Sequence, residues 1–173
     1  MAFTFRAATA ADAAPLAEFA ERTFRETFGP DNRPADMERY IAGAYGADLQ
    51  RAEILEPGLL TLLAEAGGTL AGFVQLRGGG APACVGGPAP VEVWRFYVAR
   101  PWQGRGLAAV MMAQALDAAR ARGGGTAWLA VWERNARAIA FYRRCGFEVV
   151  GAQPFLLGTD RQNDFVMARS LGA

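Results

Sequence analysis

The stretch VEVWRFYVARPWQGRGLAAVMM, residues 91–112, decides the fold of this chain. Its first part, residues 91–98, is rich in β-branched and aromatic residues, which predicts a strand. A loop containing Gly104 and Gly106 follows, and from Leu107 onward the helix formers Ala, Leu and Met predict a helix. Glycines allow a ligand to approach the backbone, and the first turn of a helix presents free N–H groups and partial positive charge. We therefore expect this strand, loop and helix to bind an anion such as a diphosphate.

Two common phosphate motifs fit this loop poorly. The P-loop requires Lys and then Ser or Thr after its second glycine, where this chain has Leu107 and Ala108. The dinucleotide fingerprint matches Gly104, Gly106 and Ala109, but it also requires an acidic residue about 20 positions later. Residues 123–126 read GGGT instead, so this motif is only weakly supported.

A third pattern, [Q/R]-x-x-G-x-[G/A], is met by Gln103, Gly106 and Ala108. It resembles the acetyl-CoA loop of the GCN5-related N-acetyltransferases (the GNAT superfamily). A second segment, WERNARAIAFYRRCGF at residues 132–147, resembles the helix of that superfamily that runs from an Asn to a Tyr. The resemblance implies an α/β fold: a single GNAT domain over residues 1–173, with a mixed, mostly antiparallel, twisted central sheet flanked by helices.

The resemblance also implies where acetyl-CoA binds. It would lie in a splayed groove between the strand ending at Val98 and the strand ending at Val131. Backbone groups of the first strand would pair with the pantetheine amides, and the glycine loop would hold the diphosphate, with Arg105 adding a charge-assisted contact. Asn135 is expected to cap its helix and to contact the pantetheine or the pyrophosphate arm. The expected cofactor-binding residues are Phe96, Tyr97, Val98, Gln103, Gly104, Arg105, Gly106, Leu107, Ala108, Asn135 and Tyr142.

Two residues are expected to be catalytic. The tyrosine that matches Tyr142 in the superfamily is assigned the role of proton donor to the departing thiolate, and a phenol with a pKa near 10 suits that role. Many members of the superfamily use a carboxylate on the strand before the loop as general base, which implies Glu92, the only acid on this strand. A solvated edge charge is an equally open interpretation of Glu92. Strand alternation predicts that Glu92, Trp94, Phe96 and Val98 share one face. Trp94 stands where related sequences often carry a second acid.

The acceptor is predicted from two further segments. Residues 24–41 (FRETFGPDNRPADMERYI) and residues 131–171 look like the corresponding parts of PaiA-like spermidine/spermine N-acetyltransferases. The first 60 residues carry ten acids against six arginines, which suits a polycationic amine. We expect Glu26, Asp31, Asp36 and Glu38 to bind the acceptor. Two alternatives stay open: acetylation of a protein N-terminus, peptide or antibiotic, and a non-catalytic CoA-binding sensor.

Composition excludes several other classes of function. The net charge of +1 implies no general attraction to nucleic acid or membranes. The partner that the resemblance implies is a small-molecule amine. The absence of His excludes Ser-His-Asp and Cys-His catalysis and leaves zinc with poor ligands, so no metal is expected. Cys84 and Cys145 are too few for a disulfide framework. The N-terminal segment does not resemble a signal peptide and no apolar run could span a bilayer, so we expect a cytoplasmic protein. The expected state is a monomer or, if the C-terminal strand is exposed, a homodimer.

The remaining elements follow from periodicity and from turn residues. Residues 78–90 (GGGAPACVGGPAP) predict a loop, which is either a mobile segment beside a cleft or an ordinary hairpin connection. The predicted helices cover residues 12–27, 35–46, 47–55, 107–122 and 135–146, and the predicted strands cover residues 3–7, 59–64, 70–77, 91–98, 126–131, 147–150 and 164–168.

Overall fold

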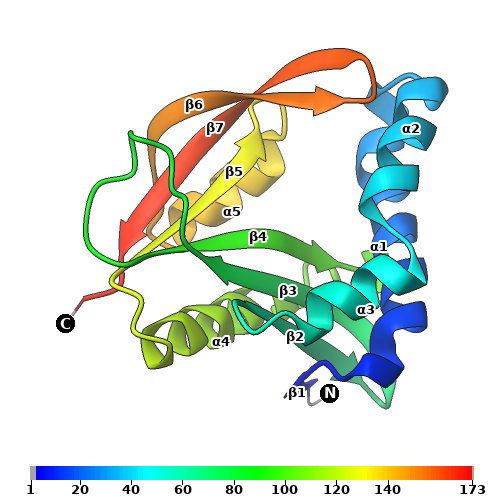
Figure 1. Cartoon of the computed structure of the whole chain (residues 1–173), viewed down its shortest axis with the longest axis horizontal. Coiled ribbons are helices and arrows are strands. Elements are labelled where there is room, and N and C mark those ends of the chain that lie inside the picture. Colours follow the sequence, from blue (N-terminus) through cyan, green and yellow to red (C-terminus); the bar gives the residue numbers. More distant parts are fainter. Residues whose placement is uncertain (1–2, 173) are drawn as a thin grey trace.

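A computed structural model describes residues 3–172 of the chain as one seven-stranded sheet with helices on both faces (Figure 1). The strand order is β1-β2-β3-β4-β5-β7-β6, and every neighbouring pair is antiparallel except β4 and β5. The expected mixed, mostly antiparallel sheet is therefore confirmed.

The elements agree with most of the predicted segments. The helices are α1 (Ala13–Phe28), α2 (Pro34–Ala44), α3 (Ala47–Leu55), α4 (Leu107–Ala121) and α5 (Ala136–Arg144). The strands are β1 (Phe3–Ala7), β2 (Leu59–Ala66), β3 (Thr69–Gly78), β4 (Pro90–Val98), β5 (Thr126–Trp132), β6 (Glu148–Leu157) and β7 (Asp160–Ser170). Short 3₁₀ turns lie at Ala10–Asp12, Gly29–Asp31 and Arg100–Trp102.

The sheet splays open at its centre. Strands β4 and β5 pair in parallel only where Pro90 to Glu92 face Thr126 to Trp128. Beyond Glu92 the edge of β4 that faces β5 has no strand partner among the described residues. In Figure 1, β5 and β7 rise steeply away from β3 and β4. The expected groove between β4 and β5 is therefore present.

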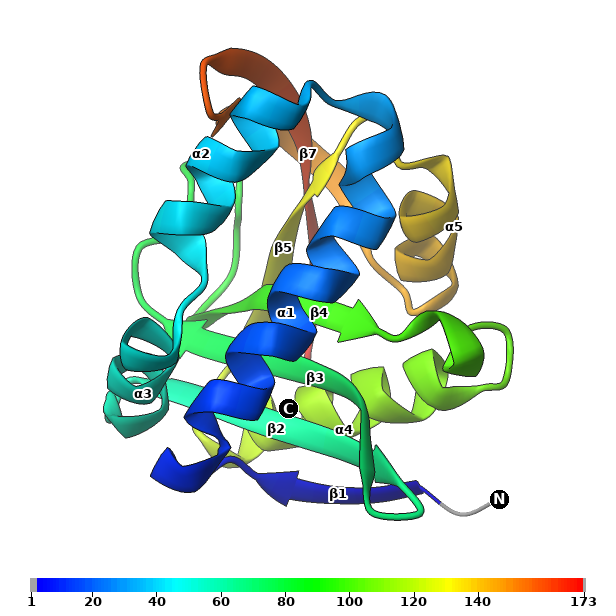
Figure 2. The ribbon, with the colours of Figure 1, turned by 90° about the vertical axis from the view of Figure 1, so that its right-hand side faces the viewer.

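Two apolar clusters hold the helices on opposite faces of the sheet. Helix α4 buries Leu107, Met111 and Met112 against one face, where α5 also packs. Helices α1 and α2 bury a second cluster, which includes Phe24 and Ile41, against the other face. Figure 2 shows α1 crossing in front of the sheet and α4 behind it.

A β-bulge at Trp94 changes which side chains of β4 share a face. Leu76 on β3 is opposite Val93 and the preceding Gln75 is opposite Arg95, so Trp94 is one extra residue in the ladder. A bulge of this kind shifts the alternation of the strand by one position.

The predicted shared face of β4 is therefore wrong beyond the bulge. Phe96 and Val98 pack with the cluster of α4 and α5, and Tyr97 packs with that of α1 and α2. The ring of Trp94 lies between the Arg77 and Arg95 guanidinium groups, 4.1 Å and 3.9 Å from its centroid.

The last two strands are longer than the predicted residues 147–150 and 164–168. Strand β6 has 10 residues and β7 has 11, and they form a hairpin that turns at Gly158, whose φ is +61°. Gly151 and Pro154 interrupt the apolar pattern of β6, which is why the sequence predicted an early end. Pro154 is tolerated because β6 is the edge strand and one side of its backbone needs no partner.

The glycine-rich connection between β3 and β4 lies against β6. A Cβ atom on Gly151 would stand 2.6 Å from Cys84 Sγ, so this glycine makes room for the connection. The connection contributes no lining residue to the main cavity described below. Within residues 3–172, no helix has the length and the hydrophobicity that a membrane crossing requires.

Candidate active site

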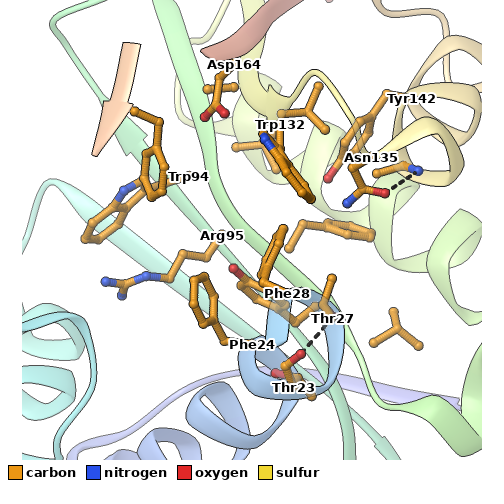
Figure 3. A pocket seen from close by; sticks show the side chains of 18 of the residues that line it. Thr23, Phe24, Thr27, Phe28, Trp94, Arg95, Trp132, Asn135, Tyr142 and Asp164 are labelled. Atoms are coloured by element: carbon orange, nitrogen blue, oxygen red, sulfur yellow. Dashed lines mark hydrogen bonds between the residues drawn. The ribbon is translucent and has the colours of Figure 1, made fainter. Parts of the chain in front are cut away.

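A cavity of about 610 Å³ occupies the splay between β4 and β5. Its walls come from α1, α2, α4, α5, β3, β4, β5 and the β6–β7 hairpin, so it connects the two faces of the sheet (Figure 3). We call the part bordered by α4 and α5 the donor side, and the part bordered by α1, α2 and β6 the acceptor side.

The donor side is built around the glycine loop. Gln103 anchors the loop because its Nε2 donates a hydrogen bond of 2.9 Å to the carbonyl of Val98. Gly104 and Gly106 adopt φ values of +73° and +84°, which favour glycine and turn the chain into α4. At the start of α4, the N–H groups of Leu107 and Ala108 have no intrahelical acceptor by helix geometry, whereas the N–H of Ala109 donates to the Gly106 carbonyl.

Asn135 begins α5, as predicted. Its Oδ1 accepts a hydrogen bond of 3.1 Å from the N–H of Ala138, so the capping role is confirmed. Arg137 in the first turn donates a hydrogen bond of 2.8 Å to Gln103 Oε1, which links α5 to the glycine loop across the cavity.

Tyr142 lies on α5 and lines the cavity with 9% of its surface exposed. Its ring packs against Phe96, Phe141 and Phe147, with centroids 5.4 to 6.3 Å away. Burial raises the pKa of the Tyr142 phenol above its ordinary value, so the hydroxyl keeps its proton at neutral pH. A protonated phenol at this point can donate a hydrogen bond to an anion that forms in the cavity.

The donor side fits a long, flexible anionic ligand of the expected kind. The free edge of β4 beyond Glu92 can pair with amides, and the N-terminus of α4 can receive phosphate groups. Seven of the eleven expected cofactor-binding residues line the cavity: Phe96, Tyr97, Val98, Gln103, Ala108, Asn135 and Tyr142.

The other four, Gly104, Arg105, Gly106 and Leu107, are not among the lining residues and form the rim at the N-terminus of α4. The Leu107 side chain is fully buried in the core, so only its backbone can meet a ligand. The Arg105 guanidinium lies 5.8 Å from the centroid of the Trp102 ring.

The acceptor side has aromatic walls. In Figure 3, Trp94 and Trp132 lie on either side of the space below Asp164, and Phe28 and Phe24 lie below that space. The remaining aromatic lining residues on this side are Tyr40, Tyr45, Tyr97 and Phe155. Arg77 and Arg95 already lie against the Trp94 ring, so a further cation would lie against the other rings.

The predicted acceptor-binding acids are not brought together. Glu26 lines the cavity, whereas Asp31, Asp36 and Glu38 are not among its lining residues. Glu38 is exposed and paired with Arg25.

Asp36 has a structural role instead. The N–H and the hydroxyl of Thr159 each donate a hydrogen bond of 2.7 Å to Asp36 Oδ1, and Arg33 Nε donates one of 2.8 Å to Oδ2. These hydrogen bonds tie the N-terminus of α2 to the β6–β7 turn.

Glu92 lines the cavity and is 7% exposed, so it is not the solvated edge charge of the alternative interpretation. Its Oε2 accepts a hydrogen bond of 2.5 Å from Arg77 Nε, which balances its charge. The predicted role of Glu92 as general base stays a prediction.

The sequence analysis missed Asp164, which lies on β7 and lines the cavity. It is 7% exposed, and its buried Oδ1 has no hydrogen-bond partner within residues 3–172. Burial, with a smaller contribution from Glu133, raises the pKa of Asp164 to about 6. The only local signal was an acid at the start of an apolar run, and its position beside the cavity depends on its pairing opposite Trp132.

Comparison with known proteins identifies the family. Residues 16–147 match the model of the acetyltransferase (GNAT) family. The chain is 33% identical to an uncharacterized N-acetyltransferase encoded beside pepI in Lactobacillus delbrueckii subsp. lactis, over 86% of each chain. It is also 33% identical to an uncharacterized N-acetyltransferase of Mycobacterium bovis, over 92% of this chain and 98% of the relative.

A solved structure shows the same fold at lower identity. The PaiA N-acetyltransferase of Thermoplasma acidophilum, in complex with coenzyme A, superimposes with a TM-score of 0.79 at 22% identity, over 98% of this chain and 99% of that one. The family match agrees with the splayed sheet and with the glycine loop before α4. This chain therefore belongs to the GNAT family of acetyltransferases, enzymes that use acetyl-CoA as the acetyl donor.

Proposed function

We propose that this enzyme transfers an acetyl group directly from acetyl-CoA to a primary amine, and that the amine is a polyamine such as spermidine or spermine. The observation that carries the proposal is the continuous cavity. It connects an open strand edge and Tyr142 on the donor side with an aromatic, carboxylate-bearing pocket on the acceptor side.

On the donor side, the chain supplies binding groups. The open edge of β4 from Val93 to Val98 would pair with the pantetheine arm, and the N–H groups around Gly106 would hold the diphosphate. Arg137 adds positive charge near this loop. The thioester that acetyl-CoA supplies has a carbonyl carbon open to attack by an amine.

Tyr142 is the proposed proton donor on the same side. Its raised pKa keeps the phenol protonated, so it can stabilise the thiolate by a hydrogen bond as the thiolate forms. Direct transfer, without an enzyme-bound acetyl group, is supported by Cys145. Burial raises the pKa of this thiol, which keeps it in the poorly nucleophilic protonated form.

The acceptor side favours a cation because of how its charges are paired. Arg77 is paired with Glu92 and Arg95 with Glu53, each at 2.5 Å. Two further lining carboxylates, of Glu26 and Asp164, take part in none of the salt bridges formed within residues 3–172. Aromatic walls with unpaired carboxylates suit the ammonium groups and methylene segments of a polyamine.

The test is the release of CoA thiol from acetyl-CoA in the presence of spermidine, spermine, a short peptide and an aminoglycoside. We expect the polyamines to give the highest kcat/KM, and we expect Glu26→Gln to lower it more for spermine than for a monoamine. If acetyl-CoA binds and only the peptide or the aminoglycoside is acetylated, the polyamine assignment is wrong. If no amine is acetylated, the proposed reaction itself is wrong.

A further inference from the structure

Asp164 differs from the other acids that line the cavity because it is both buried and unpaired. Glu92 is equally buried, but Arg77 binds it at 2.5 Å. Glu26 is only partly buried, on α1. Since a buried carboxylate without a counterion is unfavourable, the site is incomplete until a cation or a proton reaches it.

The fold holds Asp164 rigidly. Its backbone is paired on both sides, opposite Trp132 of β5 and Gln153 of β6. In Figure 3 the Asp164 carboxylate points into the space between Trp94 and Trp132. The side chain therefore faces the acceptor side from a position between two paired strands, where little movement is possible.

No guanidinium group faces this carboxylate as a direct partner among residues 3–172. The titratable groups around it are Tyr40 from α2, Tyr97 from β4 and Glu133 directly after β5, while Gln153 on β6 is neutral. Arg95 is already bound to Glu53 at 2.5 Å. The surroundings of Asp164 thus raise its affinity for a proton and leave its charge free for a cationic ligand.

We propose that Asp164 binds the reacting ammonium group of the acceptor and removes its proton. This inference rests on the proposed function and adds to it the residue that prepares the nucleophile. An ammonium group entering between Trp94 and Trp132 would meet the carboxylate at the end of the aromatic walls.

The reaction then balances as follows. The ammonium nitrogen gives one proton to the Asp164 carboxylate and becomes a neutral amine with a free electron pair. That pair forms the C–N bond with the thioester carbonyl carbon, and the C–S bond breaks with its electrons on sulfur. The second proton lost from nitrogen neutralises the thiolate, assisted by the Tyr142 hydroxyl, and Asp164 releases the first proton to solvent.

Asp164 fits this role better than Glu92 on geometric grounds. Arg77 binds Glu92 through a charge-assisted hydrogen bond of 2.5 Å, so this carboxylate already has a cationic partner. Such a bond would have to break before Glu92 could act as a base. Asp164 has no bond to break, because its Oδ1 lacks a partner within the described residues.

The test compares Asp164→Asn with Asp117→Asn, a control that removes an exposed carboxylate of α4 by the same substitution. The first measurement is kcat/KM for spermidine as a function of pH. We expect Asp164→Asn to lose about 100-fold or more at pH 7 and to recover part of this loss as rising pH supplies neutral amine. Asp117→Asn should follow the wild type.

The second measurement is the binding of spermidine to the enzyme without acetyl-CoA, by calorimetry. We expect Asp164→Asn to weaken this binding about tenfold. If the wild type binds spermidine through Asp164 but acetylates no amine, the proposed function fails while the ammonium site stands. If Asp164→Asn keeps both the affinity and the pH profile of the wild type, the role of Asp164 is refuted.

Discussion

Replacing Asp164 by Asn should remove a pH-dependent loss of stability that the wild-type enzyme carries. Burial raises the pKa of this carboxyl from 3.8 to about 6, so the folded state holds its proton more tightly than the unfolded state does. The contribution of Asp164 to the free energy of unfolding is therefore greatest below pH 3.8, and it decreases as the pH rises to about 6. At neutral pH the folded protein carries the full penalty of the buried charge.

The two pKa values differ by about 2 units, and each unit corresponds to about 1.4 kcal/mol, so the penalty is at most about 3 kcal/mol. Solvent that enters the cavity screens the charge, so we expect about 1.5 to 3 kcal/mol. Asn mimics the protonated acid and does not titrate. The difference in unfolding free energy between Asp164→Asn and the wild type should therefore grow by this amount from pH 4 to pH 7.

Urea unfolding at several pH values in this range measures the difference directly. Other titrating groups contribute equally to both proteins, so they cancel in the difference. A difference in unfolding free energy that does not change with pH reports only how the Asn amide packs. The control variant Asp117→Asn reports the effect of removing a charge at an exposed site. A difference that stays constant within about 0.5 kcal/mol across the range would show that Asp164 is not held at a raised pKa, and the argument from its burial would be wrong.

Three further outcomes are expected. Tyr142→Phe should lower kcat about 100-fold or more while the KM for acetyl-CoA stays within about twofold, measured by thiol release, and an unchanged kcat would exclude the phenol as proton donor. Gly106→Ala and Gly123→Ala place a methyl group at φ values of +84° and +83° at opposite ends of α4, in open space. Each should lose about 1 kcal/mol of stability, but only Gly106→Ala should weaken acetyl-CoA binding in calorimetry, and equal affinities would argue against the loop as the diphosphate site. Asp36→Ala should lower the midpoint of urea unfolding because it leaves the N–H and hydroxyl of Thr159 without their acceptor, and an unchanged midpoint would show that this link to α2 is not needed.

Most of the fold could be predicted because its signals are local. The glycine loop after β4 was visible in the sequence, and Gly104 and Gly106 do take the left-handed conformation that favours glycine. Asn135 was predicted to cap α5, and its side chain accepts the hydrogen bond that a cap requires. In each case a residue type and its near neighbours determine the conformation, so no distant contact is needed to infer it.

The errors in the fold arose where distant contacts decide the structure. The bulge at Trp94 exists because β3 pairs with β4 in two registers, with Leu76 opposite Val93 and Gln75 opposite Arg95. Nothing within β4 alone reveals this shift, so strand alternation gave the wrong face for its second half. The length of β6 was likewise set by its pairing with β7 rather than by its own residues.

The candidate site divides in the same way. Residues of the donor side were inferred from the resemblance of two short motifs, and seven of the eleven line the cavity because each motif lies within one loop or helix. Acids of the acceptor side were predicted from charge alone, and charge does not show which acids are already bound. Glu38 is paired with Arg25 and Asp36 holds Thr159, whereas Asp164 faces the cavity only because β7 pairs beside β5.

The bulge at Trp94 gives β4 its two roles in this site. Before the bulge, Glu92 lies on the acceptor side with Arg77, and after it Tyr97 lies on that same side while Phe96 packs against Tyr142 on the donor side. A regular strand would place residues 92 and 96 on one face and residue 97 on the other. The extra residue therefore places Glu92 and Tyr97 together on the acceptor side and Phe96 on the donor side, while the open backbone edge of β4 stays available along the splay. Because Trp94 itself lies between two guanidinium groups, the residue that creates the bulge is also held in place by the cavity wall. In the proposed reaction, the thioester and the amine would meet beside β4, and pairing with β3 fixes the geometry of this strand.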